Sequence, residues 1–203
     1  MDGTIVFDTE DCCDRDALKR CPWVEDIPIF IDYHDNEWGI PVYEDDKLFE
    51  MLILESMQAG LSWITILKKR ESFREAFDGF NPHKIAHYDE KKVEELMNNS
   101  GIIRNRLKIN AAIANAQIFL NIVKEHGSFS KFIWKYVDYE PIVGHWKNLE
   151  DIPATTTLSD RISKDLKKMG FKFLGPTTVY AFMQATGMVN DHLESCKWKH
   201  PKM

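Results

Sequence analysis

Two cysteine–histidine pairs near opposite ends of the chain are the residues whose types and spacing most clearly suggest chemistry. Cys21 and His34 lie near the start, and His192 and Cys196 form an H-x-x-x-C pair near the end. Two thiolates and two imidazoles complete a tetrahedral zinc shell, and an i, i+4 pair can share one face of a helix or turn. Because four protein ligands leave no open position, such a zinc ion would be structural and would tie the terminal segments together.

The cysteine spacing leaves alternatives open at this site. The four cysteines, at positions 12, 13, 21 and 196, follow no disulfide framework, which favours reduced thiols or a metal site over bridges. Spacing alone does not select the ligands, because His200, Cys12 and Cys13 are also of ligand type. A cysteine or histidine that is merely packed is the ordinary alternative for each position.

A glutamate at position 55 shares the apolar face of a predicted helix. Leu48, Leu52 and Glu55 fall at i, i+4 and i+7, so the carboxylate points inward with the leucines. A buried carboxylate is costly unless it meets donors or positive charge. Each aromatic residue of this region is by itself most simply a core residue, but together with Glu55 they would form a cage for a flat, cationic, hydrogen-bonding ligand. These aromatic residues are Trp23, Tyr33, Trp38 and Trp63.

The charge distribution is uneven. The whole chain has a formal net charge of -6, which by itself disfavours a nucleic-acid partner. Residues 1–50 hold 15 acids and 4 bases (net -11), so residues 51–203 hold 17 acids and 22 bases (net +5). Basic clusters at 68–70, 104–108 and 164–172 are equally compatible with phosphate contact and with solvated helix faces, so charge does not decide the partner.

The elements that position these residues are predicted to be helices. Apolar spacing is helical nearly throughout, and no stretch shows a sustained period of two, so we expect an all-α fold. One helix is predicted from Asp45 toward Gly60 and another from about Ser62 through Arg70. Further helices are expected at about 89–99, 104–125 and 130–136.

Residues 157–187 predict two helices joined by a short turn. The first begins with a capping-box variant at Thr157–Asp160 and ends at Gly170, and the second begins at Pro176 and stops at Gly187. This pattern describes a helix-hairpin-helix module, in which glycine permits close backbone approach and the amides of the second helix can bind a DNA phosphate. The alternative is an ordinary αα-corner. The residues expected to contact DNA here are Gly170, Lys172, Gly175 and Thr177.

Length and hydropathy limit the class of protein. A chain of 203 residues suits one compact domain that buries a real core without disulfides. No run approaches the ~18 apolar residues of a membrane span, and the first residues lack the pattern of a secretory signal. We therefore expect a cytoplasmic monomer that binds no membrane.

Six strings in the chain, in this order, resemble the 3-methyladenine DNA glycosylase I family. The resemblance covers about residues 20–197, and the joint specificity of strings this long is high. The strings are YHDNEWG (Tyr33–Gly39), LESMQAGLSW (Leu54–Trp63), LKKR (Leu67–Arg70), GIIRNR (Gly101–Arg106), GFKFLG (Gly170–Gly175) and VNDH (Val189–His192).

The resemblance implies a helix-hairpin-helix DNA glycosylase domain over residues 20–197, with an extension at 1–19 and a tail at 198–203. It implies one structural zinc ion, held by Cys21, His34, His192 and Cys196. It places Tyr33, Glu55 and Trp63 in the base pocket, with Glu55 as the catalytic residue, and the aromatic clustering adds Trp23 and Trp38 to the predicted pocket. It also makes Gly60 and Leu61 the loop that enters the gap left by a flipped nucleotide.

Two features depart from the family pattern. Residues 1–19 have no counterpart in it, and the Cys12–Cys13 pair has no assigned role. Other helix-hairpin-helix glycosylases carry a catalytic Asp after the hairpin. Asp191 is close enough in sequence to be considered, but it can equally be a hydrogen-bond partner of a ligand histidine.

The implied reaction is hydrolysis of the N-glycosidic bond of 3-methyladenine in double-stranded DNA, with free 3-methyladenine as product. An alkylated adenine carries positive ring charge and departs readily, so the main tasks are flipping and selecting the base. No residue is marked as a nucleophilic lysine, which predicts base excision without strand cleavage. The rival classes are a non-catalytic sensor of alkylated DNA with the same fold and a zinc-dependent hydrolase, which would need an open ligand position.

Overall fold

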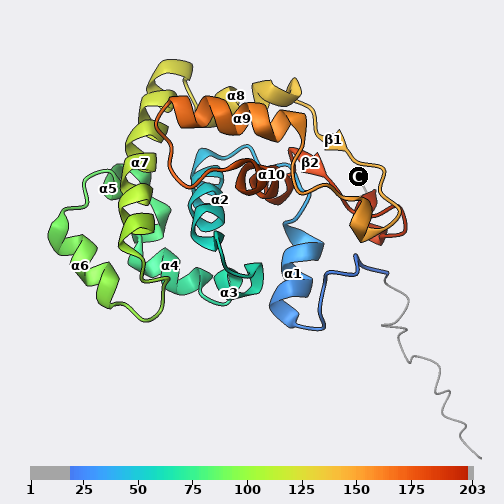
Figure 1. Ribbon diagram of the computed structural model, residues 1–203, viewed down its shortest axis with the longest axis horizontal. Coiled ribbons are helices and arrows are strands. Elements are labelled where there is room, and N and C mark those ends of the chain that lie inside the picture. The colour runs from blue at the N-terminus through green and yellow to red at the C-terminus, as the bar shows by residue number, and fades with distance from the viewer. Residues whose placement is uncertain (1–18, 201–203) are drawn as a thin grey trace, which may run out of the picture.

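The computed structural model describes residues 19–200 and is mostly helical (Figure 1). Cys12 and Cys13 therefore lie outside the described residues. The α-helices are α1 (Pro28–Asn36), α2 (Asp45–Gln58), α3 (Trp63–Leu67), α4 (Arg70–Ala76), α5 (Pro82–Ile85), α6 (Glu90–Asn98), α7 (Arg106–His126), α8 (Phe129–Trp134), α9 (Thr157–Lys168) and α10 (Pro176–Ala185). Short 3-10 helices are η2 (Asp78–Phe80), η3 (Lys135–Val137), η4 (Leu149–Asp151) and η5 (Lys197–Lys199).

Helix α2 lies at the centre of the molecule. It packs against α10, α7, α3 and α8, and every residue from Met51 to Met57 is buried (Figure 1). A helix that is apolar on most of its circumference has to be buried on most sides. The predicted helix from Asp45 is confirmed, and it ends before Gly60, whose φ of 80° continues the chain in a left-handed conformation.

The helix predicted from Ser62 through Arg70 is interrupted. Helix α3 ends at Leu67, and α4 begins at Arg70 after Lys69, which has a φ of -103° and a ψ of 0°. After this break the Arg70 guanidinium reaches two carboxylates, with Nε 2.6 Å from Glu50 and Nη1 2.7 Å from Glu37. A tertiary ion-pair network of this kind is not visible in helical periodicity. Helices α1 and α5 were not predicted at all.

Helices α9 and α10 form the predicted pair joined by a short turn. The capping box lies one residue earlier than predicted: Thr156 Oγ1 accepts from the Ser159 N–H at 3.1 Å, and Ser159 Oγ accepts from the Thr156 N–H at 2.9 Å. Gly170 has a φ of 101°, and Pro176 opens α10 as predicted. The two helices pack directly against each other.

The expectation of an all-α fold needs one correction. Strand β1 (Ile142–Val143) pairs in parallel with strand β2 (Val189–Asn190), with Ile142 opposite Val189. Two-residue strands are too short to produce a period-two signal in the sequence. Their pairing fixes the segment after η3 beside the C-terminal segment.

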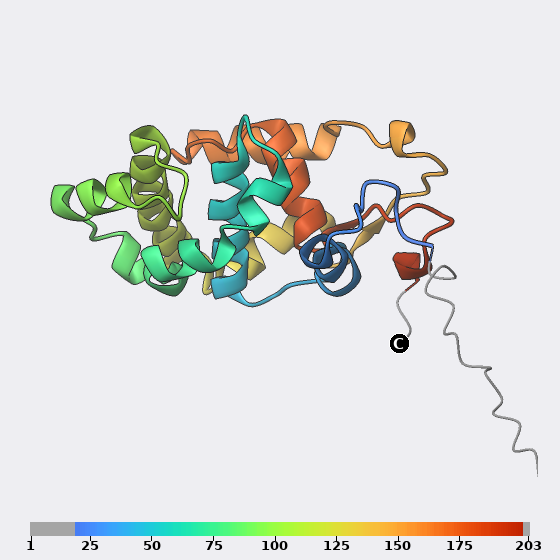
Figure 2. The ribbon, with the colours of Figure 1, turned by 90° about the horizontal axis from the view of Figure 1, so that it is seen from below.

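The two ends of the described chain lie together at one end of the molecule. Figure 2 shows the N-terminal segment in blue and the C-terminal segment in red side by side, beyond α1. The Lys197 N–H donates to the Lys19 carbonyl at 3.0 Å, and Trp198 packs against His34 with ring centroids 5.3 Å apart. Within residues 19–200, no helix combines the length and the apolar character needed to cross a bilayer.

Gly187 is required by the packing of α10 on the N-terminal loop. Its φ is 65°, and a Cβ there would lie 2.2 Å from the Ile40 carbonyl carbon. We expect Gly187→Ala to lower the free energy of unfolding by about 2–4 kcal/mol, because it adds backbone strain to a steric overlap. Urea denaturation measures this. Gly175→Ala is the control, with a φ of -69° and no atom within 4 Å of the added methyl, and should cost at most about 1 kcal/mol. Equal denaturation midpoints for the two variants would contradict this account.

Candidate active site and metal cluster

A pocket of about 520 Å³ lies between the N-terminal segment, the end of α2, α3 and α10. The structure brings to it all five residues that the sequence suggested for a base pocket. These are Trp23, Tyr33, Trp38, Glu55 and Trp63. Residues far apart in the sequence thus contribute to one cavity. Its opposite wall comes from η4, the residues after it, and α10.

Aromatic rings form the walls on the N-terminal side. Trp23 packs edge-on against Trp38, with ring centroids 5.0 Å apart, and Tyr33 lies 5.4 Å from Trp63. Tyr33 and Trp38 are buried, whereas Trp23 and Trp63 are partly exposed. Ring faces attract cations and stack on planar groups. This lining therefore suits a flat, positively charged ligand.

Glu55 is buried in this pocket with an unpaired oxygen. Its side chain comes from the last turns of α2 and is 3% exposed, and Oε2 has no hydrogen-bond partner. Desolvation raises the pKa of Glu55 to about 8. Burial, and after it the nearby charge of Glu55, raises the pKa of the Tyr33 hydroxyl well above its usual value. The Trp63 indole N–H is likewise buried without a partner, so the pocket holds an unused acceptor and an unused donor.

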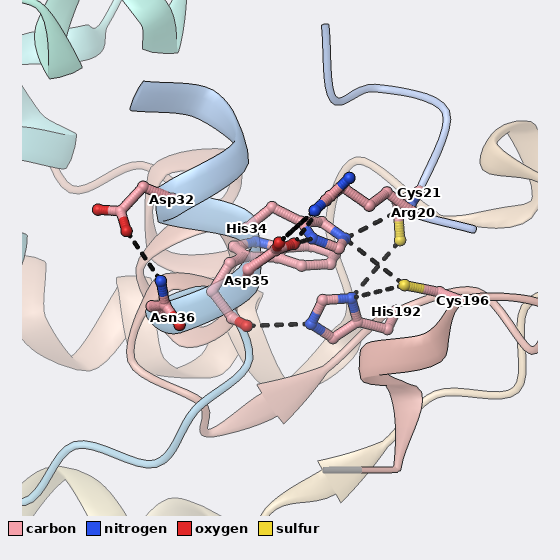
Figure 3. A network of polar contacts seen from close by, with 9 residues as sticks. Arg20, Cys21, Asp32, His34, Asp35, Asn36, His192 and Cys196 are labelled. Carbon is pink, nitrogen blue, oxygen red and sulfur yellow. Dashed lines mark hydrogen bonds and ion pairs between the residues drawn. The ribbon is translucent and has the colours of Figure 1, made fainter. Parts of the chain in front are cut away.

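Cys21, His34, His192 and Cys196 converge on one buried point (Figure 3). All four ligand atoms lie within 4.8 Å of one another. The Cys196 Sγ is 3.4 Å from His192 Nδ1 and 3.5 Å from His34 Nε2, and the Cys21 Sγ is 3.6 Å from His192 Nδ1. Around a tetrahedral zinc ion, usual bond lengths place sulfur and nitrogen ligands about 3.6 Å apart. The donor set and its spacing therefore fit a four-coordinate metal ion.

The second nitrogen of each histidine is held by an acceptor. His34 Nδ1 lies 2.7 Å from Asp35 Oδ1, and Asp35 is in turn held by Arg20 at 2.7 Å. His192 Nε2 lies 3.0 Å from the Trp38 carbonyl. Such partners orient metal-binding imidazoles. The Cys21 thiol and then the two imidazoles lower the pKa of Cys196, so this sulfur is a ready thiolate. His200, a rival ligand by type, is not part of the cluster.

The cluster lies directly behind the aromatic wall of the pocket. Tyr33 and His34 are consecutive residues of α1, and one lines the pocket while the other joins the cluster. The Trp38 ring lies 4.6 Å from the His192 ring, and the Trp23 ring lies 5.3 Å from the His34 ring. None of the four cluster residues lines the pocket itself. A metal in this cluster would therefore support the wall without contacting a ligand in the cavity.

Asp191 has neither of the environments that the sequence suggested for it. Its carboxylate accepts from Trp146 Nε1 at 2.6 Å, Tyr180 OH at 2.5 Å and Gln184 Nε2 at 2.8 Å. The expectation that it partners a ligand histidine is wrong, because these donors already surround it. It also does not line the pocket but holds Tyr180 and Gln184, which do.

One face of α10 supplies pocket residues that sequence reasoning missed. Thr177, Tyr180, Ala181 and Gln184 line the cavity and fall at i, i+3, i+4 and i+7. The signal was present in the sequence as a polar stripe on an otherwise apolar helix. Thr177 was predicted to contact DNA, and the structure places it at the pocket, exposed in the first turn of α10.

The remaining residues suggested for DNA contact lie on two exposed segments. Gly60 and Leu61 follow α2, and the Leu61 side chain is 40% exposed. Gly170, Lys172 and Gly175 belong to the turn between α9 and α10, where Lys172 and Gly175 are exposed.

Several basic residues that were compatible with phosphate contact are buried or form ion pairs within the protein. Arg70 is paired with Glu37 and Glu50, and Arg106 is paired with Glu90 and Glu94. Lys108 is buried. These residues are therefore not a free basic surface.

Comparison with known proteins agrees with this geometry. A family model described as methyladenine glycosylase matches residues 23–200. The chain belongs to this family. The DNA-3-methyladenine glycosylase of Haemophilus influenzae is 52% identical over 180 residues, covering 89% of this chain and 97% of that protein. DNA-3-methyladenine glycosylase 1 of Escherichia coli is 50% identical over 179 residues, covering 88% and 96%.

A solved structure has the same fold. That of 3-methyladenine DNA glycosylase I (TAG) from Staphylococcus aureus, described for its recognition of 3-methyladenine, is 41% identical with a TM-score of 0.88. The match covers 92% of this chain and 100% of that one. The family resemblance seen in the sequence is thus confirmed, and the chain is a glycosylase, an enzyme that hydrolyses N-glycosyl bonds.

Burial of Glu55 gives this glycosylase a testable pH dependence of stability. Its folded pKa of about 8 lies above the unfolded value of about 4.3, so the folded protein keeps a proton that the unfolded chain releases between these pH values. The contribution of Glu55 to the free energy of unfolding is therefore fully present below pH ~4.3 and is lost as the pH rises toward 8. The loss is about 1.4 kcal/mol per pH unit. Glu55→Gln should remove this slope, and at pH 9 its free energy of unfolding should exceed that of the wild type by about 5 kcal/mol.

Urea denaturation from pH 5 to 9 measures this effect. Glu25→Gln is the matched control, because Glu25 lines the same pocket but is exposed. It should leave the pH profile unchanged. Parallel profiles for wild type and Glu55→Gln would contradict a desolvated Glu55.

Proposed function

We propose that this glycosylase flips 3-methyladenine out of double-stranded DNA and hydrolyses its bond to deoxyribose, acting as a monomer and leaving the strand intact. The observation that carries the proposal is the pair of buried, unpartnered polar atoms in an aromatic pocket, Glu55 Oε2 and Trp63 Nε1. Buried polar groups in native proteins almost always have partners. The lack of protein partners for Glu55 Oε2 and Trp63 Nε1 is best explained if a bound ligand supplies those partners.

An alkylated adenine fits both unused groups. Its exocyclic amine can donate to the Glu55 carboxylate, and a ring nitrogen can accept from the Trp63 indole N–H. Its positive ring charge favours the ionised form of Glu55 and the faces of the surrounding rings. An uncharged adenine would gain less from the same pocket. Selection therefore rests on charge as well as on shape, and Tyr33 and Trp63 line the pocket beside the base.

The cleavage step needs little assistance from the protein. A cationic base is a good leaving group, and water attacks the sugar carbon as the bond to the base breaks. As the bond breaks, its electron pair goes to the base, which leaves as a neutral molecule, and the positive charge passes to the sugar carbon. Glu55 binds and orients the cationic base before this step through the exocyclic amine of the base. Within the described part of the chain, no lysine lines the pocket, which supports hydrolysis without a covalent amine intermediate and without strand cleavage.

DNA is engaged by two segments in this proposal. Leu61 is an exposed leucine in the loop between Gln58 and Ser62, two residues that line the pocket, and it is suited to fill the space left by a flipped nucleotide and so offset part of the lost stacking. The turn between α9 and α10 acts as the hairpin of a helix-hairpin-helix module. Gly175 precedes helix α10 as its N-cap residue without a side-chain cap, and no atom lies within 4 Å of a Cβ placed there. Its first amides can therefore approach a phosphate closely.

A structural zinc ion completes the proposal. Cys21, His34, His192 and Cys196 would hold it, and it would supply a cross-link between the terminal segments. Four buried protein donors leave no position for substrate, which disfavours a zinc-dependent hydrolase. The base pocket then keeps its shape because its wall is anchored from behind.

Release of free base tests the function and separates it from the sensor alternative. The wild type should release 3-methyladenine from methylated duplex DNA, detected by chromatography, and kcat/KM should rise with pH and level off above about 8 as Glu55 ionises. Glu55→Gln should bind free 3-methyladenine about ten- to a hundredfold more weakly, because a charge-assisted hydrogen bond is lost. Glu25→Gln is again the control. Binding to methylated DNA without base release would indicate a sensor instead.

Metal analysis tests the cluster. The purified wild type should contain one tightly held zinc ion per chain, and Cys196→Ala should lose it together with thermal stability. His200→Ala changes a ligand-type residue outside the cluster and should keep both. A wild type free of zinc after purification without chelators would refute the zinc proposal.

A further inference from the structure

Lys108 is a buried cation that the proposed reaction does not use. It lies in the first turn of α7 and is 6% exposed, and burial lowers the pKa of its ammonium. No carboxylate in the described part of the chain forms an ion pair with it. Its Nζ donates instead to the carbonyls of Met57 and Ala59, at 2.8 and 2.7 Å. A lysine is rarely buried without an acidic partner, so this placement needs an explanation.

The two carbonyls lie where α2 ends and the Leu61 loop begins. The last carbonyls of a helix have no partner within the helix, and a cation there is stabilised by the helix dipole. Directly after Ala59 the chain turns through Gly60, with a φ of 80°, and the Leu61 N–H donates back to the Gln58 carbonyl at 2.6 Å. Lys108 therefore fixes the backbone from which Leu61 projects. Glu55 lies only one turn earlier in the same helix.

The same helix also holds the turn between α9 and α10. Asn115 is fully buried in α7, donating from Nδ2 to the Lys172 carbonyl at 3.1 Å and accepting from the Lys172 N–H at 2.8 Å. Lys108 and Asn115 are seven residues apart, which places them on one face of α7, about 10.5 Å apart along its axis. One rigid helix thus binds the backbone of both segments that the proposed function assigns to DNA.

We propose that Lys108 is a positioning residue for excision from duplex DNA, and that α7 holds the Leu61 loop and the α9–α10 turn at a fixed separation through Lys108 and Asn115. This inference rests on the proposed function, because it gives those two segments their roles. Insertion of Leu61 must coincide with phosphate contact at the hairpin. If the loop could shift by about 1 Å, Leu61 would be misplaced and the rate of base excision would fall strongly.

A pair of lysine variants tests the proposal. Lys69 is the matched control, because its Nζ also donates to two backbone carbonyls, those of Ser100 and Gly101, which belong to the turn after α6 and not to the Leu61 loop. Lys108→Met should lower single-turnover release of 3-methyladenine from methylated duplex DNA about ten- to a hundredfold. It should also weaken binding to a duplex carrying a tetrahydrofuran abasic analogue. Affinity for free 3-methyladenine should stay within about twofold of wild type, as should every property of Lys69→Met.

Two further measurements separate positioning from general stability. Lys108→Arg keeps a donating cation and should recover most of the lost rate; it also provides a folded variant if the methionine variant does not fold. In a Leu61→Ala background, Lys108→Met should cost little more, because the two changes act through the same loop. Full additivity of the two losses would overturn the inference.

Other outcomes are equally decisive. Equal duplex binding by Lys108→Met and Lys69→Met would refute the positioning role, and a parallel loss of free-base affinity would place the effect in the pocket instead. If the wild type released no base from methylated DNA, the proposed function would fail. Binding to the abasic-analogue duplex would then still decide the role of Lys108, since that duplex offers no base to excise.

Discussion

The meeting of the two terminal segments at Cys21, His34, His192 and Cys196 is the contact on which the pocket depends. The pocket wall on the N-terminal side is carried by α1 and the loops on either side of it. Tyr33 is adjacent to His34, and the Trp38 carbonyl accepts from His192, so the wall and the cluster share one piece of backbone. Because side chains of the wall pack on the imidazoles, loosening the cluster would loosen the wall.

The pocket is built around a buried carboxylate, Glu55, whose desolvation costs free energy in the folded protein. Glu55 lies within the buried run Met51–Met57 of α2 with one oxygen unpaired, and its desolvation raises its pKa to about 8. A fold selected only for stability would place an apolar residue there. Retaining the acid leaves the empty pocket with an unpaired carboxylate oxygen, and in the proposed function a cationic base supplies the missing positive charge and hydrogen-bond donor. Under that proposal, specificity for a damaged base over a normal one comes from the same interaction that weakens the free protein.

Rigid support comes from lysine and asparagine side chains that bind backbone carbonyls. Lys108 of α7 donates to carbonyls at the end of α2, and Asn115 of α7 donates to the Lys172 carbonyl in the turn before α10. The Asp191 carboxylate accepts hydrogen bonds from side chains of α10. These residues lie outside the lining of the pocket, and they bind the backbone of the adjoining loops and side chains of its α10 wall. Several basic residues of the described chain are thus used for structural bonds.

The sequence by itself determined the helical class, the inward direction of Glu55 and the candidate ligands. These depend on local periodicity and residue chemistry, and both are readable along the chain. Family strings then selected Cys21, His34, His192 and Cys196 from rivals that spacing could not separate. Only the tertiary structure decided that the cluster backs the pocket wall, that α10 lines the opposite side, that Asp191 holds Tyr180, and that Lys108 is buried. These are contacts between segments distant in sequence, and no local pattern records which donor will meet which acceptor once the helices pack.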